Sequence, residues 1–166
     1  MTPLYTLYLV RHGIAEPRGE RWPDDDLRPL SPEGTTRMKR AARGLAALEE
    51  PVGVVLTSPL VRAVQTAEIV RKALGLGAPL VHCQALAPGG SPRDVAAGVQ
   101  ELGLSGAFVL VGHEPDLGAL AGWLLGTRAP LAFKKGAVGR IDVAARPTAG
   151  SGRLVWFLPP RVLRGL

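Results

Sequence analysis

The chain has 166 residues, 46% of them hydrophobic, and its formal net charge is +6. This length suits one domain with its own core, and the apolar content excludes an intrinsically disordered chain. The basic residues are scattered and aromatic residues are few, so we expect an anionic substrate and no nucleic-acid partner.

The chain opens on an apolar segment, Met1–Val10, that lacks the basic start and cleavage site of a secretory signal. Its β-rich run over 5–10 predicts a first strand. A polar, proline-rich loop follows at Glu16–Leu30, and the sequence gives no role for it. No apolar run reaches the roughly 20 residues that span a bilayer, so we expect no membrane partner and a cytoplasmic location.

Beyond the loop, helical and strand patterns alternate along the chain. A serine, a proline and an acidic residue at 31–33 are typical of a helix start. Apolar residues at helical spacing predict helices at about 34–50, 60–74, 91–102 and 116–125. Short apolar or β-rich runs predict further strands at about 52–56, 80–83, 108–111, 137–143 and 153–158.

Strands that alternate with helices predict an α/β fold: a three-layer α/β/α sandwich around a mainly parallel sheet of about six strands. The last two strands have no helix between them, which indicates an antiparallel edge. No linker or repeat divides the chain, so we expect a single domain over residues 1–166. The abundance of arginine and proline and the lack of asparagine are typical of a thermophile-like composition, or of a GC-rich genome.

Polar residues follow three of the predicted strands. They are Arg11-His12 after the first strand, Thr57-Ser58 with Arg62 after the second, and His113-Glu114 after the fourth. In an open α/β sheet, ligands bind beyond the carboxyl ends of the strands, so we expect these residues to converge. Arginine forks match phosphate oxygens, and a neutral imidazole can attack phosphorus. The set therefore suits a phosphoryl group, with Gly13 allowing the backbone to approach a ligand.

Simpler interpretations exist for each of these residues. Arg62 could be a solvated helix residue, His113 could cap a helix, and His12 with His113 could bind a metal ion. A third ligand at the usual spacing is missing, so we expect neither a metal nor any other cofactor. The single cysteine, Cys83, is interpreted as a small core residue and His82 as a surface or strand residue.

Three motifs carry a resemblance to a known family. They are Leu9–Gly13, Ser58–Ala67 and Val111–His113, and they resemble, in order, the three blocks of the histidine phosphatase superfamily, which includes the cofactor-dependent phosphoglycerate mutases. The short length, Asp25–Gly34 and Trp156–Pro160 resemble the SixA-type phosphohistidine phosphatases. The similarity runs from about residue 7 to about residue 163.

This resemblance implies a phosphoglycerate mutase-like fold and a metal-independent phosphatase. It implies that His12 is a nucleophile that becomes phosphorylated, and that Arg11, Arg62 and His113 complete a pocket that would also hold free phosphate or sulfate, with Gly13 and Ser58 beside it. The implied substrate is a phosphorylated protein, namely a phosphohistidine domain of a phosphorelay. A small phosphorylated metabolite is the alternative substrate, and a non-catalytic phosphate-binding module is the alternative function.

The chain departs from the family in one respect. Larger members carry an acidic proton donor after the third strand, where this chain has Leu86–Ser91 without a carboxylate. Glu114, next to His113, is the first candidate for the general acid. Asp24, Asp25 and Asp26 are weaker candidates, and we interpret them first as a solvated run of charge.

Overall fold

The computed structural model describes residues 4–77 and 80–166, so Met1–Pro3 of the predicted first segment lie outside the described residues. The strands are β1 (Tyr5–Arg11), β2 (Val54–Thr57), β3 (Leu80–His82), β4 (Gly106–Gly112), β5 (Val138–Val143) and β6 (Gly152–Leu158). The α-helices are α1 (Pro32–Ala47), α2 (Val61–Ala73), α3 (Pro92–Glu101), α4 (Asp116–Leu125) and α5 (Pro160–Leu163). Two short 3-10 helices are η1 (Asp25–Leu27) and η2 (Gln84–Leu86).

The strands form one six-stranded sheet in the order β3-β2-β4-β1-β5-β6. The pairs β3-β2, β2-β4 and β4-β1 are parallel, whereas β5 pairs antiparallel with both β1 and β6. The predicted mainly parallel sheet with an antiparallel edge is therefore confirmed. Arg11 of β1 lies opposite Gly112 of β4, so the residues that follow these two central strands emerge side by side.

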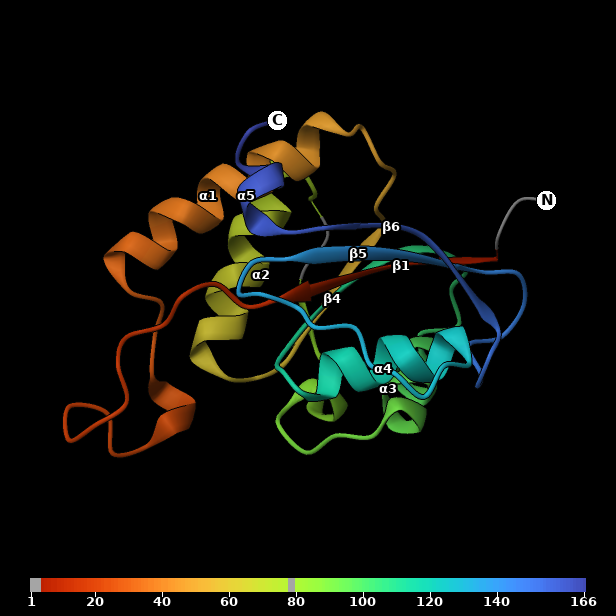
Figure 1. Ribbon diagram of the computed structural model, residues 1–166, viewed down its shortest axis with the longest axis horizontal. Helices are drawn as coiled ribbons and strands as arrows, with labels where there is room; N and C mark the ends of the chain where they lie inside the picture. The colour runs from red at the N-terminus through yellow and green to blue at the C-terminus, as the bar shows by residue number, and fades with distance from the viewer. Residues whose placement is uncertain (1–3, 78–79) are drawn as a thin grey trace.

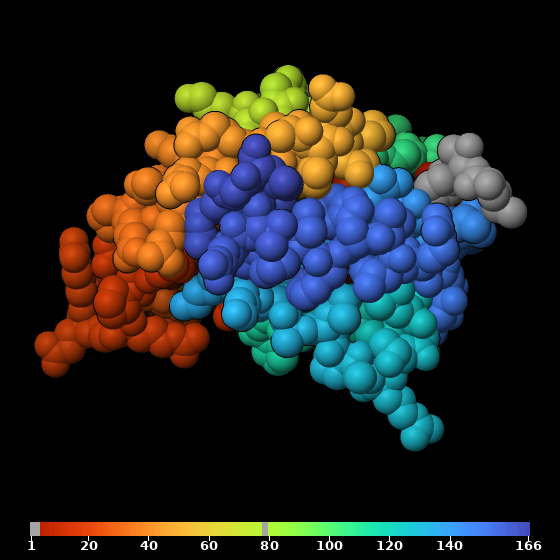
Figure 2. All heavy atoms as spheres, turned by 45° about the horizontal axis from the view of Figure 1, so that its top comes forward, coloured from red at the N-terminus to blue at the C-terminus, as the bar shows by residue number. Residues whose placement is uncertain are grey.

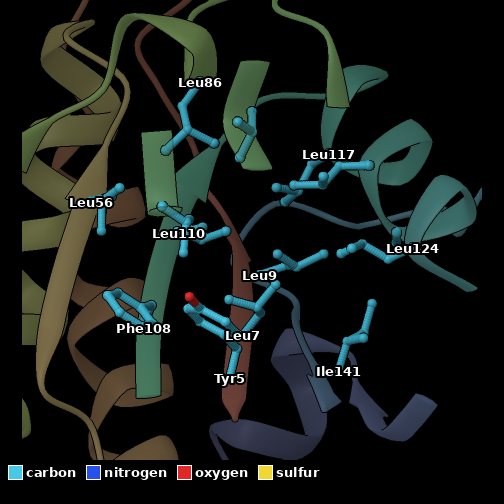
Figure 3. Packing of buried hydrophobic residues seen from close by; sticks show 14 of the residues in the cluster. Tyr5, Leu7, Leu9, Leu56, Leu86, Phe108, Leu110, Leu117, Leu124 and Ile141 are labelled. Carbon is cyan, nitrogen blue, oxygen red and sulfur yellow. The ribbon is translucent and has the colours of Figure 1, made fainter. Parts of the chain in front are cut away.

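Helices cover both faces of the sheet, and the core has two halves (Figure 1). Tyr8 and Val10 of β1 pack toward α1, α2 and α5. Leu7 and Leu9 face the opposite side, where they pack with Leu110 of β4 and with α4 (Figure 3). A strand that is buried on both faces appears in the sequence as a continuous apolar run. These runs are why β1 and β4 could be predicted close to their observed positions.

The boundaries of the predicted elements shift by a few residues, and one helix was missed. α1 begins at Pro32 after the Ser31 cap, whose Oγ accepts a hydrogen bond from the Gly34 amide. The prediction that two strands close the chain was wrong, because α5 follows β6 and buries Leu163 completely. Pro159 caps this short helix and Pro160 is its first residue, and a single turn offers no helical periodicity to detect.

The loop Glu16–Leu30 extends from the carboxyl end of the central strands and projects at one end of the molecule (Figure 2). Two contacts tie its ends together: Ala15 bridges Leu30, and the Glu16 amide donates to the Pro29 carbonyl at 2.8 Å. The loop therefore forms a wall beside that end of the sheet. Among the residues described, no helix has the length and apolar character needed to cross a membrane.

Candidate active site

The residues that follow β1, β2 and β4 meet at one edge of the sheet. The His12 amide donates to the Gly112 carbonyl at 3.1 Å, and the Ser58 amide donates to the Val111 carbonyl at 3.0 Å. These bonds continue the strand pairing just past the strand ends and fix the neighbouring side chains. The ring centroids of His12 and His113 lie 5.0 Å apart, so residues 101 positions apart in the chain share one site.

His12 is held in one tautomer. Its ring is 6% exposed, and Nδ1 lies 2.7 Å from the carbonyl oxygen of Gly13. A carbonyl can only accept, so Nδ1 carries the proton and the lone pair of Nε2 is free. Burial lowers the pKa of His12 to about 3, and the positive charges of nearby arginines act in the same direction. The ring is therefore neutral at physiological pH, the state that a nucleophilic nitrogen requires.

Gly13 and Thr66 fix this end of β1 against α2. The Gly13 amide donates to Thr66 Oγ1 at 3.1 Å, and the Thr66 hydroxyl donates to the Arg62 carbonyl at 2.8 Å. A Cβ at Gly13 would lie 3.3 Å from Leu30 Cδ2, so little space remains for a side chain there. Thr66 is fully buried and was not named as a site residue from the sequence, although it lies within the second motif.

His113 and Ser58 form a buried pair. His113 Nε2 lies 2.7 Å from Ser58 Oγ, which also accepts from the Leu60 amide at 3.3 Å. Burial and then the charge of Arg62 lower the pKa of His113 to about 4. The interpretation of His113 as a residue whose side chain caps α4 is wrong. The Leu117 amide of α4 donates to the backbone carbonyl of His113 at 2.8 Å, and not to its imidazole ring.

Each of the two arginines presents a buried donor without a partner. Arg11 Nη1 donates to the Phe133 carbonyl at 2.7 Å, and Arg62 donates from Nη1 and Nη2 to Asp25. Among the described residues, the Nε atoms of both arginines are buried and have no hydrogen-bond partner. An unsatisfied buried donor is costly, so both atoms are suited to an anion that is bound between them. Arg62 is 3% exposed, so interpreting it as a solvated helix residue was wrong.

Asp25 belongs to the site as well. Its Oδ1 accepts from Arg28 Nε at 2.8 Å and its Oδ2 from Arg62 Nη2 at 2.9 Å. The hydrogen bond from Arg28, with the charge of Arg62, lowers the pKa of Asp25. Interpreting the acidic run as solvated is therefore wrong for Asp25, whereas Asp24 and Asp26 are exposed.

Glu114 accepts a hydrogen bond from the backbone of α4. Its Oε1 lies 2.7 Å from the Gly118 amide, at the first turn of the helix. Glu114 thus lies at the site, as predicted from the sequence, and its Oε1 is already engaged as the acceptor of a backbone amide.

These side chains line a cavity of about 470 Å³. Its wall consists of Arg11, His12, Ala15, Glu16, Pro17, Arg18, Asp25, Arg28, Arg62, Pro88, His113, Glu114 and Lys135. Five of these side chains are cationic and three are carboxylates, so with neutral imidazoles the wall carries two excess positive charges. A phosphoryl dianion carries about two negative charges, so the wall is electrostatically matched to it. The sequence did not single out Arg18, Arg28 or Lys135, whose charges are common on any surface.

Other candidates from the sequence lie elsewhere. His82 is exposed and Cys83 is half-buried, packed at the margin of the core near α3. Within 4–77 and 80–166, no group of three or more histidine, cysteine, aspartate or glutamate side chains could hold a metal ion.

Comparison with known proteins shows the family of the chain. The family model of the histidine phosphatase superfamily (branch 1) matches residues 7–87, which include His12 and Arg62. An uncharacterised protein of Picosynechococcus is 45% identical over 117 residues, covering 69% of this chain and 70% of that protein. The chain belongs to the histidine phosphatase superfamily.

Two SixA relatives extend the likeness over nearly the whole chain. The phosphohistidine phosphatase SixA of Escherichia coli is 28% identical over 156 residues, 93% of each chain. A structure of the protein histidine phosphatase SixA with tungstate has a TM-score of 0.83 and 27% identity, and the match covers 95% of this chain and 99% of that one. This member of the superfamily is therefore a phosphatase with the phosphoglycerate mutase-like fold, most similar in type to the SixA branch.

Proposed function

We propose that this phosphatase removes the phosphoryl group from a histidine of a phosphorylated protein, through a phosphohistidine intermediate on His12 and without a metal ion. The observation that carries the proposal is the neutral His12, with Nε2 free, beside two buried arginine Nε atoms that lack a partner. Together they supply a nucleophile and an anion clamp in one cavity.

In the first step, Nε2 of His12 attacks phosphorus in line and the leaving atom departs on the opposite side. Arg11 and Arg62 hold the phosphoryl oxygens, and the His113–Ser58 pair lies beside them. In the second step, water attacks the phosphohistidine and the electron pair of the P–N bond returns to Nε2. The Gly13 carbonyl keeps the Nδ1 proton in place throughout, so His12 regains its starting tautomer.

Two features support a phosphohistidine substrate. The Escherichia coli relative SixA is named a phosphohistidine phosphatase, and the SixA structure with tungstate is named a protein histidine phosphatase. Asp25 forms an ion pair with Arg62, and Glu114 accepts a hydrogen bond from the Gly118 amide, so both carboxyl groups already have partners. An imidazole leaves more readily than an alkoxide and places less demand on a proton donor. The partner that fits these features is the phosphohistidine domain of a phosphorelay.

A second candidate is a small-molecule phosphomonoesterase. The cavity of about 470 Å³ lies within the range of about 300–1,000 Å³ that is usual for small ligands. The loop Glu16–Leu30 contributes part of the wall of this cavity, which helps to enclose a small substrate.

The decisive experiment is turnover of a phosphorylated histidine-containing domain by the purified chain, with and without a chelator. We expect dephosphorylation that the chelator leaves unchanged, and acid-labile phosphate trapped on the chain during turnover. His12→Ala should abolish both, and Arg62→Ala should reduce turnover by orders of magnitude, because a charge-assisted clamp is lost. His82→Ala removes an exposed histidine that does not line the cavity and serves as the matched control.

Three results would contradict the proposal. Full activity of His12→Ala would exclude the nucleophile, and loss of activity with the chelator would exclude the metal-free mechanism. Higher efficiency on a panel of sugar phosphates than on the phosphorylated domain would favour the phosphomonoesterase. Phosphate binding without any turnover would favour the non-catalytic module.

A further inference from the structure

The side of the cavity that receives the leaving group is defined by His12. His12 is a cavity residue that is only 6% exposed. Because the leaving atom departs opposite the attacking nitrogen, in-line displacement directs it away from this buried residue and toward the opening of the cavity. Arg18 and Lys135 are exposed residues of the cavity wall on that outer side. A proton donor for the leaving atom must come from the groups near the mouth.

The carboxylates of the wall are poorly placed for this task. Glu114 accepts from a backbone amide at a helix start, and Asp25 is bound between Arg28 and Arg62. The contacts of Asp25 lower its pKa and stabilise its ionised form, which has no proton to give, and the Glu114 Oε1 atom is turned toward the backbone of α4. Glu16 is the remaining carboxylate of the wall, and its backbone fixes Arg28 through a carbonyl contact of 2.8 Å.

Lys135 is anchored to Arg11 on both sides of its own position. The carbonyl of Phe133 accepts from Arg11 Nη1 at 2.7 Å, and the Gly136 amide donates to the Arg11 carbonyl at 3.1 Å. Within the part of the chain that the structure describes, Lys135 forms no ion pair with a carboxylate. Its backbone is thus fixed relative to the phosphate clamp, while its ammonium group is free to meet a substrate.

Lys135 lines the cavity together with arginines 11, 18, 28 and 62. Burial lowers the pKa of Lys135, and the charges of these four arginines lower it further. A lysine with a lowered pKa gives up its proton more readily than an ordinary lysine, which is the direction of tuning that a general acid requires.

We propose that Lys135 is the proton donor to the leaving atom, and that it extends this phosphatase to phosphate esters of phenols and alcohols. The inference rests on the proposed phosphoenzyme mechanism. As the P–O bond breaks, its electron pair stays on the leaving oxygen, which takes a proton from Nζ. In the second step, the Lys135 amine takes a proton from the attacking water while the P–N bond to His12 breaks, so the ammonium group is restored.

The test compares Lys135→Met and Lys135→Arg with the wild type on two substrates. Phenyl phosphate has a basic leaving group that needs a proton, whereas p-nitrophenyl phosphate has a stable anionic one. We expect Lys135→Met to lower kcat on phenyl phosphate by about 100-fold, and on p-nitrophenyl phosphate by a much smaller factor. Lys135→Arg should be equally impaired on phenyl phosphate, because arginine keeps the charge but does not release a proton.

Lys134→Met is the matched control, because Lys134 is exposed and does not line the cavity. Equal losses on both substrates, or recovery of phenyl phosphate turnover by Lys135→Arg, would show that Lys135 supplies only charge and would overturn the proposal. A selective loss in Glu16→Gln and none in Lys135→Met would assign the proton to Glu16 instead. In all these cases, acid-labile phosphate on His12 would still support the phosphoenzyme mechanism, so the two proposals fail separately.

Discussion

Asp25 holds Arg62 through both its side chain and its backbone. Arg62 Nη2 lies 2.9 Å from Asp25 Oδ2, and Nη1 lies 2.7 Å from the Asp25 carbonyl oxygen. The contact joins α2 to the loop Glu16–Leu30, for which the sequence offered no role. Among the described residues, Nε of Arg62 is then the donor without a partner, so the loop orients the proposed phosphate clamp before any substrate arrives.

We predict that Asp25→Ala lowers kcat/KM by about 10-fold to 100-fold, because a freed guanidinium must be ordered again in each catalytic cycle. Asp25→Asn should retain most of the activity, since the amide oxygen can accept the same hydrogen bond. Steady-state kinetics on p-nitrophenyl phosphate measure both variants. Asp26→Ala is the control, because Asp26 is exposed and, among the residues described, the ion-pair partner of Arg62 is Asp25; equal losses in Asp25→Ala and Asp26→Ala would contradict the prediction.

A second prediction concerns the protonation of the two site histidines. Burial lowers the pKa of His12 to about 3 and that of His113 to about 4. We expect their imidazole NMR signals, assigned with His12→Gln and His113→Gln, to stay in the neutral form between about pH 5 and pH 8. A titration midpoint near the ordinary histidine value for either ring would contradict the structure.

The same shift links pH to stability. In the unfolded chain His12 is protonated below its ordinary pKa of 6.5, whereas in the folded state its pKa is about 3. The unfolded state therefore binds more protons within this window, and the free energy of unfolding falls as the pH falls through it. Above the window both states are neutral, so this residue contributes no pH dependence there.

The sequence predicted the sheet and the centre of the site because both rest on local patterns. Buried strands such as β1 appear as continuous apolar runs, and the ends of parallel strands meet at one edge, which brought His12, His113 and Arg62 together. Contacts between loops and distant side chains have no such local pattern. The ion pair of Asp25 with Arg62 joins residues 37 positions apart, and nothing in the acidic run distinguishes Asp25 from its neighbours.

A third prediction concerns a polar cluster around Glu50, which lies on the face of the sheet opposite α4. Glu50 Oε2 accepts from Tyr8 Oη at 2.9 Å and from Arg140 Nη1 at 2.6 Å, and Oε1 accepts from Trp156 Nε1 at 3.3 Å. We expect Glu50→Gln to lower the free energy of unfolding by about 2 kcal/mol, because a buried donor loses its charged partner. Urea unfolding measures the change, with the exposed Glu49→Gln as control.

The pH dependence of this loss follows from the pKa of Glu50. Burial alone would raise this pKa, but the hydrogen bonds from Tyr8, Arg140 and Trp156 outweigh it and lower the value. A carboxyl with a lowered folded pKa contributes stability above its ordinary pKa, and the contribution is lost as the pH falls through the folded value. The difference between wild type and Glu50→Gln should therefore shrink in acid; a difference independent of pH would contradict the assignment.

The last prediction concerns the packing of α5, the helix that the sequence did not reveal. A Cβ at Gly44 of α1 would overlap the carbonyl oxygen of Leu163, whose side chain is fully buried. Gly44→Ala should therefore displace α5 and lower the free energy of unfolding by about 2 kcal/mol, because backbone atoms cannot yield as a flexible side chain does. Gly77→Ala is the control, since a Cβ there meets no atom within 4 Å. Urea unfolding should show the control unchanged or slightly stabilised, and equal stability of the two variants would mean that α5 does not pack on α1 at this position.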